Sequence, residues 1–232
     1  MRKVVLMMTA FFLVAAMGSA ASLCTSFAGP QNVAVGDFSC SLGGLTFSDF
    51  EVVSAAGNPA PEVDLVSAKV AGSWVYLVFN PNMSAPPGGS AQDLYFYYTV
   101  SGGVTAVGQY TGGVNATVTE HVCDTAFDSS NLCTGNELVN MASFSGAGSN
   151  VVVSPSFAST PNIYIFKDIG VSPSSPNAGG GGLTSFAQSF NSTGTSNGGG
   201  GGAGGEVPEP VTFILMGSGL VGLSLLKRVR KA

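Results

Sequence analysis

Nucleophilic catalysis needs a serine or cysteine with a base beside it, and this sequence offers little for that chemistry. His121 is the only histidine in the chain, and no serine lies in a Gly-x-Ser-x-Gly elbow. His121 lies between Glu120 and Val122 in a strand-like segment close to Cys123. We therefore expect His121 to be a solvent-facing strand residue beside a disulfide, and we predict no catalytic residue and no enzymatic activity.

Carboxylate chemistry is the next candidate, because glycoside hydrolysis uses a pair of acids. Eleven acidic residues lie between positions 37 and 168, but no motif frames a pair of them. The loop 123–133 holds Asp124, Asp128 and Asn131, whose oxygens are hard ligands of the kind that calcium prefers. The loop lacks Asp-x-Asp-x-Asp-Gly spacing. A solvated loop is therefore the main prediction, these three residues are weak calcium candidates, and no cofactor is expected.

A run of aromatic residues offers a different chemistry, the stacking of rings on sugars. The run is Tyr95, Phe96, Tyr97 and Tyr98, and alternation along a strand places Tyr95 and Tyr97 on one face. If that face is exposed, these two tyrosines are the candidate carbohydrate contacts. A central strand packed on both faces is the simpler interpretation of the same pattern.

Four cysteines, Cys24, Cys40, Cys123 and Cys133, form an even set. In an exported chain this number predicts two disulfides. Three pairings are possible, and we prefer Cys24 with Cys40 and Cys123 with Cys133 because both close short loops. A zinc site with His121 is the alternative, but the sequence contains no Cys-x-x-Cys pair.

The basic residues are concentrated at the two ends of the chain. Six of the eight lie among the first three and the last six residues, which leaves only Lys69 and Lys167 in between. The middle of the chain is therefore strongly acidic, and binding to a nucleic-acid backbone is excluded as a main function.

Both ends also carry apolar runs. Residues 1–21 have a basic start, an uncharged run and small residues before a cleavage point, the layout of a secretory signal peptide. Residues 210–226 are uncharged and would span ~26 Å as a helix, short but sufficient for a membrane. The basic tail 227–231 predicts that the C terminus stays in the cytoplasm while the rest is exported.

Four residues, Val207, Pro208, Glu209 and Pro210, lead directly into the apolar run and the basic tail. With this motif, the segment 207–232 resembles a PEP-CTERM sorting signal. The resemblance implies that an exosortase, a membrane enzyme, cuts near the Pro-Glu-Pro motif and passes the exported part to the cell surface or beyond. Members of this family are associated with bacteria that make exopolysaccharide and biofilm.

The segment 22–190 is rich in Val, Phe, Tyr and Thr between Gly, Pro, Asn and Ser, without a helical period. This texture predicts an all-β domain, most simply a two-layer antiparallel sandwich of jelly-roll or immunoglobulin-like type, with a closed barrel as the alternative. Glycines predict tight turns at 71–73 and 101–103. The expected strands are 63–70, 74–79, 94–100, 104–110, 116–122, 138–144, 150–153, 163–169 and 183–190. Residues 191–206 are almost all Gly, Ser, Thr and Asn, which predicts a flexible linker.

Together these observations predict an exported surface or matrix protein with a structural or interaction role in the envelope, biofilm or exopolysaccharide. Before processing it would be anchored in the membrane by its C-terminal helix. The alternative is a carbohydrate-binding module that uses Tyr95 and Tyr97, and a secreted hydrolase is the third interpretation.

Overall fold

The computed structural model of this chain describes residues 22–27, 29–35, 37–54, 62–145, 151–173 and 180–192. All regular secondary structure in these ranges is β-strand, which confirms the predicted all-β class. None of the described residues forms a helix long and apolar enough to cross a membrane. The predicted signal peptide 1–21, the linker after residue 192 and the sorting signal 207–232 lie outside the described residues.

The structure has 13 strands in one sheet. Their bounds are β1 (Ser22–Leu23), β2 (Gln31–Asn32), β3 (Cys40–Leu42), β4 (Leu45–Ser54), β5 (Asp64–Ala71), β6 (Trp74–Asn80), β7 (Met83–Ala85), β8 (Gln92–Val114), β9 (Ala116–Cys123), β10 (Glu137–Phe144), β11 (Val151–Val153), β12 (Thr160–Val171) and β13 (Gly181–Ser192).

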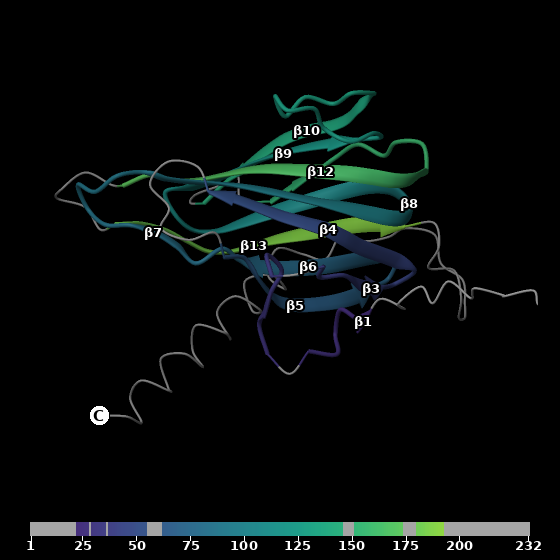
Figure 1. Cartoon of the computed structure of the whole chain (residues 1–232), viewed down its shortest axis with the longest axis horizontal. Helices are drawn as coiled ribbons and strands as arrows, with labels where there is room; N and C mark the ends of the chain where they lie inside the picture. The colour runs from purple at the N-terminus through teal and green to yellow at the C-terminus, as the bar shows by residue number, and fades with distance from the viewer. Residues whose placement is uncertain are drawn as a thin grey trace, which may run out of the picture.

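The sheet is organised around β8, which is 23 residues long. Its first part pairs with β4 on one side and β12 on the other, and its second part pairs with β13 and β11. From β12 the sheet continues to β9 and β10, and from β13 it continues to β6 and β5. All pairs are antiparallel except β1 with β3. Figure 1 shows β9, β10 and β12 at one side of the molecule and β5 and β6 at the other.

The prediction of a hairpin turn at 101–103 is wrong. Val100 and Val104 belong to the same strand, and Gly102 and Gly103, with φ of 122° and 82°, lie where the partners of β8 change. These positive φ values suit glycine. A Cβ on Gly102 would lie 2.4 Å from the backbone oxygen of Gly44, so the close approach of the two chains also requires glycine.

The other predicted turn is confirmed. Ala71 pairs with Trp74 across Gly72, whose φ is 60°, and this turn joins β5 to β6. The sequence did not predict β4, nor the short strands β1, β2, β3 and β7. At the far end, β13 continues to Ser192, two residues into the predicted linker.

The core lies where the curled sheet folds over itself. Phe47 of β4 packs on Phe190 of β13 with ring centroids 5.4 Å apart, and Phe79 of β6 packs on Phe96 of β8 at 5.2 Å. Along β8, Phe96 and Tyr98 are buried in this core while Tyr95 and Tyr97 face outward, as alternation predicts. The core therefore fixes which face of β8 is left outside.

Candidate functional site

Aromatic side chains gather on the outer face of the sheet, away from the core. In this register Tyr97 of β8 lies opposite Phe166 of β12, and Phe166 lies opposite His121 of β9. Tyr95 stands on the same face two residues before Tyr97, and Phe127 reaches it from the loop between β9 and β10. We call these five residues the aromatic face.

Phe166 is the centre of the aromatic face and is only 6% exposed. Its ring stacks on that of Tyr97, with centroids 4.9 Å apart and planes at 23°. The rings of Tyr95, Phe127 and His121 surround it at 5.6, 5.7 and 5.8 Å. These four surrounding side chains are partly exposed, so the face presents aromatic rings to solvent while Phe166 holds them in place.

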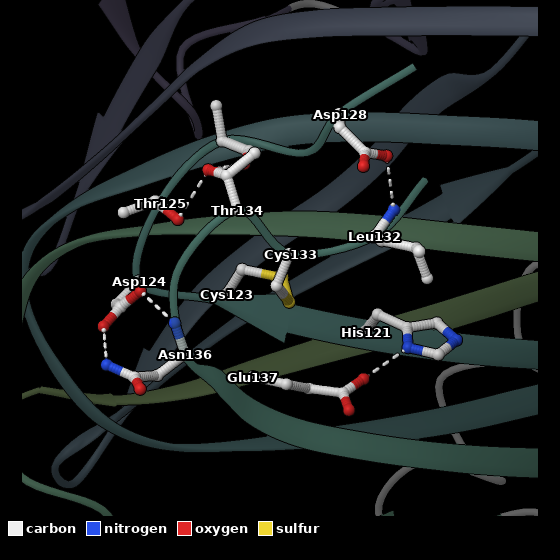
Figure 2. The surroundings of a disulfide bond; sticks show 11 residues. His121, Cys123, Asp124, Thr125, Asp128, Leu132, Cys133, Thr134, Asn136 and Glu137 are labelled. Atoms are coloured by element: carbon white, nitrogen blue, oxygen red, sulfur yellow. Dashed lines mark hydrogen bonds and ion pairs between the residues drawn. A yellow bond between two sulfur atoms is a disulfide. The ribbon is translucent and has the colours of Figure 1, made fainter. Parts of the chain in front are cut away.

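The loop between β9 and β10 is fixed at both of its ends. The Cys123–Cys133 disulfide closes it at the end of β9. The backbone N–H and the side-chain amide of Asn136 donate to the Asp124 carboxylate at 2.8 and 2.7 Å (Figure 2). Nearer the tip, Asp128 accepts hydrogen bonds from the backbone N–H groups of Ser130 and Leu132. A loop with these internal bonds keeps its shape without a ligand.

Tyr97 connects this loop to the sheet. Its hydroxyl donates to Asn131 Oδ1 at 2.8 Å, and its ring lies 6.4 Å from that of Phe127. Burial, and then the charge of Glu51, raise the pKa of Tyr97, so the hydroxyl stays protonated and remains a donor.

A groove of about 540 Å³ runs between the loop and the outer face of the sheet. Tyr97, Tyr164 and Phe127 supply aromatic surface to its lining, and Asp49, Glu51 and Asp128 supply carboxylates. The volume lies within the range of roughly 300 to 1,000 Å³ that is usual for small-ligand sites. Aromatic rings beside carboxylates can contact both the apolar face and the hydroxyl groups of a ring-shaped polar ligand.

His121 lies on the outer face of β9 beside the disulfide, as expected from the sequence. Its Nδ1 lies 2.5 Å from Oε1 of Glu137, and its side chain is 28% exposed (Figure 2). Its ring stacks on Phe166. No serine or cysteine nucleophile is among its hydrogen-bond partners in the described part of the chain, and the histidine supports the aromatic face.

The three weak calcium candidates are used separately by the loop. Asp124 accepts from Asn136, Asp128 accepts from loop N–H groups, and Asn131 accepts from Tyr97. Within the described ranges, no group of three or more His, Cys, Asp or Glu residues could hold a metal ion. These oxygens therefore stabilise the loop through the hydrogen bonds that they accept.

The predicted pairing of all four cysteines is confirmed. Cys24 is bonded to Cys40, which ties the chain next to β1 to β3, and Cys123 is bonded to Cys133. A zinc site would need these sulfurs as thiolates, so the disulfides leave that alternative without ligands.

Several groove residues are not predicted from the sequence. Tyr97 is a predicted sugar contact, whereas Asp49, Glu51, Phe127 and Tyr164 are not among the predicted contacts. Asp49 has a φ of 56°, and the register shifts between Ser48 and Glu51, so a β-bulge turns these acids toward the groove. A bulge leaves no simple alternating pattern in a sequence. Tyr164, by contrast, alternates with Ile163 and Ile165 and could have been assigned to the outer face.

Comparisons with known proteins give little similarity. No family model matches this chain, and no curated protein matches it. Among solved structures, the carbohydrate-binding module TmCBM61 in complex with β-1,4-galactotriose has a TM-score of 0.31 and 15% identity, over 61% of this chain and 84% of that chain. The enzymatically active domain of bacteriophage CBA120 tailspike protein 4 has a TM-score of 0.29 and 14% identity, over 61% of this chain and 19% of that chain. Likenesses of this size show neither fold nor activity, so any function of the groove rests on its own residues.

Proposed function

We propose that this chain is a carbohydrate-binding protein of the bacterial surface and that the groove beside the aromatic face binds a polysaccharide. The observation that carries this proposal is the presence of aromatic rings and carboxylates in one open groove, lined by Tyr97, Phe127, Tyr164, Asp49 and Glu51. The proposal favours a binding role over a purely structural one.

The chemistry of sugars suits this lining. A pyranose ring has an apolar face of C–H groups, which packs on an aromatic ring, and an edge of hydroxyl groups, which donate to carboxylates. Tyr97 is held in position by Asn131 and by Phe166, so little conformational entropy is lost when a sugar packs against it. An open groove also accepts one stretch of a long polymer, which a closed pocket would not.

The carboxylates also affect which ligands the groove can bind. Asp49 and Glu51 lie in the segment 22–190, which has eleven acidic residues and only two basic ones. Repulsion between these groups and an anionic polymer would weaken binding. The groove is therefore proposed to bind neutral polysaccharide, with the carboxylates as acceptors for hydroxyl groups.

The test is retention of polysaccharide by variants of the groove. A panel of insoluble and soluble polysaccharides that includes β-1,4-galactan identifies the polymer that the parent protein retains best. Tyr97→Ala should then weaken binding roughly fivefold, because an aromatic contact is worth about 1 kcal/mol. Tyr97→Phe, which keeps the ring and loses the bond to Asn131, should lose less.

The matched control is Phe144→Ala. Phe144 is 50% exposed and lies at the far end of β10, opposite Thr117 of β9, whereas the groove lies toward the Cys123 end. This variant should bind as the parent does. If no polymer is retained, or if Tyr97→Ala and Phe144→Ala behave alike, the groove is not a carbohydrate site.

The same assay separates binding from hydrolysis. We propose that the chain is not an enzyme, and the retained polymer should keep its length during incubation. Release of reducing ends that disappears in Asp49→Asn or Glu51→Gln would instead assign a glycoside hydrolase to the groove.

Export and sorting form the second part of the proposal. The basis is the sequence alone: the signal-peptide layout of residues 1–21 and the PEP-CTERM-like segment 207–232. An exosortase is the proposed processing partner, and the cell surface or extracellular matrix is the proposed destination. The rings packed across the curled sheet support a two-layer antiparallel sandwich as the architecture that carries the groove.

A further inference from the structure

A second group of polar residues lies on the opposite side of β12, inside the core. Lys167 of β12, Glu120 of β9, Gln188 of β13 and Gln109 of β8 are each 2% exposed or less. They come from four strands, and Lys167 Nζ lies 5.6 Å from the ring centroid of Phe186. The carbohydrate groove does not use any of them.

Burial affects the protonation of the two ionisable groups. Desolvation lowers the pKa of Lys167, and desolvation raises the pKa of Glu120, against the opposing effect of each partner's charge. Both shifts weaken the preference of the pair for its charged forms, so burial eases the transfer of a proton from Lys167 to Glu120. A neutral buried lysine amine is a nucleophile.

The hydrogen bonds of Lys167, Glu120 and Gln188 form a closed ring. Lys167 Nζ donates to Gln188 Oε1 at 2.6 Å and also to Glu120 Oε2. Gln188 Nε2 donates to the other carboxylate oxygen, Glu120 Oε1, at 2.8 Å. One carboxyl group therefore touches both the amine of the lysine and the amide nitrogen of the glutamine.

We propose that Lys167 and Gln188 join in an intramolecular isopeptide bond, formed without another enzyme, with Glu120 as the proton relay. The ring of hydrogen bonds holds a nucleophile, an amide carbonyl and an acid–base group together in a site closed to water. Proximity of this kind replaces the activation that such an amide exchange needs in solution. The bond would cross-link β12 to β13, two strands that are not sheet neighbours.

The reaction balances within this group. Lys167 passes a proton to Glu120, and the free amine attacks Cδ of Gln188. Glu120 then gives its proton to Nε2, the Cδ–Nε2 bond breaks, and ammonia leaves. Nζ then gives a second proton to Glu120, which ends as a neutral acid, and the new amide nitrogen keeps one hydrogen. A desolvated ion pair is thereby replaced by an amide and a carboxylic acid, and removal of two buried charges favours the product.

Gln109 has a positioning role. Its Oε1 accepts from Lys167 Nζ at 2.6 Å, and its Nε2 donates to the backbone oxygen of Val118 and to Ser143 Oγ, both at 2.7 Å. Its amide nitrogen therefore has no acid beside it to protonate a leaving group. Gln188, whose nitrogen contacts Glu120, is the electrophile.

The test uses trypsin on the full-length protein after denaturation and reduction. Lys69 and Lys167 are the only lysines between the two termini, so cleavage after residue 167 reports directly on a free amine there. We expect cleavage after Lys69 and none after Lys167. The intact mass should be lower than the sequence predicts by one ammonia, and tandem mass spectrometry of a chymotryptic digest should find a peptide that links β12 to β13.

Two variants and one control make the result specific. Gln188→Leu and Glu120→Gln should restore cleavage after Lys167 and the full mass, whereas Lys69→Arg should keep the link. The parent protein alone already decides the matter if a variant does not fold. Full mass with cleavage after Lys167 in the parent overturns the proposal, and so does ammonia loss that maps to an asparagine succinimide instead of the linked peptide.

Discussion

Tyr97 contributes to the groove through two separate parts of its side chain. The ring stacks on Phe166 and is partly open to the groove, while the hydroxyl donates to Asn131 of the loop. A residue fixed at both ends presents a rigid flat surface. This rigidity is what distinguishes Tyr97 from an ordinary surface tyrosine, and it depends on the disulfide loop keeping its shape.

The pKa of Asp124 reports on the shape of the loop between β9 and β10. Hydrogen bonds from the side chain and then the backbone of Asn136 lower the pKa of this exposed carboxyl. Because the folded pKa is lowered, the bonds stabilise the loop above the ordinary aspartate value, and this stabilisation is lost as the pH falls through the folded value.

We predict that Asn136→Ala raises the pKa of Asp124, since the side-chain donor is lost and the backbone donor stays. A carboxyl-carbon NMR titration measures the change directly. The pKa of Asp168, which burial and then the charge of Asp93 raise, should be the same in both proteins and is the internal control. An Asp124 titration that does not move would show that Asn136 is not its partner in solution.

At the scale of elements, the sequence predicts strands well where alternation is regular and poorly where a strand bends. The sequence predicts two strands in place of β8 because Gly102 and Gly103 are typical of a hairpin turn, yet positive φ can also bend a strand that continues. The sequence does not predict β4, because its bulge at Asp49 shifts the phase of its apolar residues. Whether a glycine pair forms a turn or a bend, and where a bulge falls, depends on the neighbouring strands, which the sequence alone does not identify.

The burial of Lys167 and Glu120 follows the alternation of apolar residues along their strands. Lys167 alternates with Ile165 and Ile169, and Glu120 alternates with Val118 and Val122, so both charges fall on the apolar face of their strands. Regular alternation therefore could have placed each charge inside. It could not have shown that the two charges meet, because that follows from the register between β9 and β12.

The two disulfides allow a prediction that distinguishes the loop beside the groove, closed by Cys123 and Cys133, from the region of β1 and β3, tied by Cys24 and Cys40. In the chain-entropy model a disulfide that closes a loop of about 15 residues adds about 3 kcal/mol to the free energy of unfolding. The two disulfides, with sequence separations of 16 and 10, close loops of about this length. Replacing either pair of cysteines with serines should lower the free energy of unfolding by a similar amount in urea titrations. Only the Cys123→Ser, Cys133→Ser variant should also lose polysaccharide retention, because only that loop carries Phe127 and Asn131.

The variant Cys24→Ser, Cys40→Ser is the matched control for this experiment. It removes a bond between β3 and the chain next to β1, at residues that do not line the groove. If both variants lose binding in proportion to stability, the loop has no separate role in the site.

At the scale of the whole molecule, charge is distributed unevenly between the middle of the chain and its two ends. The basic residues lie at the ends, and the groove lies in the acidic middle. A protein with this arrangement would be exported as a unit and then held or released at its C terminus. Where the groove works would therefore depend on what happens to residues 207–232.

The last prediction concerns Pro208, Glu209 and Pro210. We expect the apolar run 210–226 and the basic tail to stop export and hold the chain in the membrane, since an uncharged stretch of this length followed by basic residues is typical of a membrane anchor. The prolines favour extended backbone at the motif, the conformation in which a processing enzyme binds its substrate. Replacing all three residues with alanine should therefore leave export and insertion unchanged and block removal of the tail. Mass spectrometry of the mature C terminus in the native host measures this, and a host without an exosortase, in which the parent should stay full length, is the control. A triple variant that is trimmed like the parent would show that the motif is only a spacer.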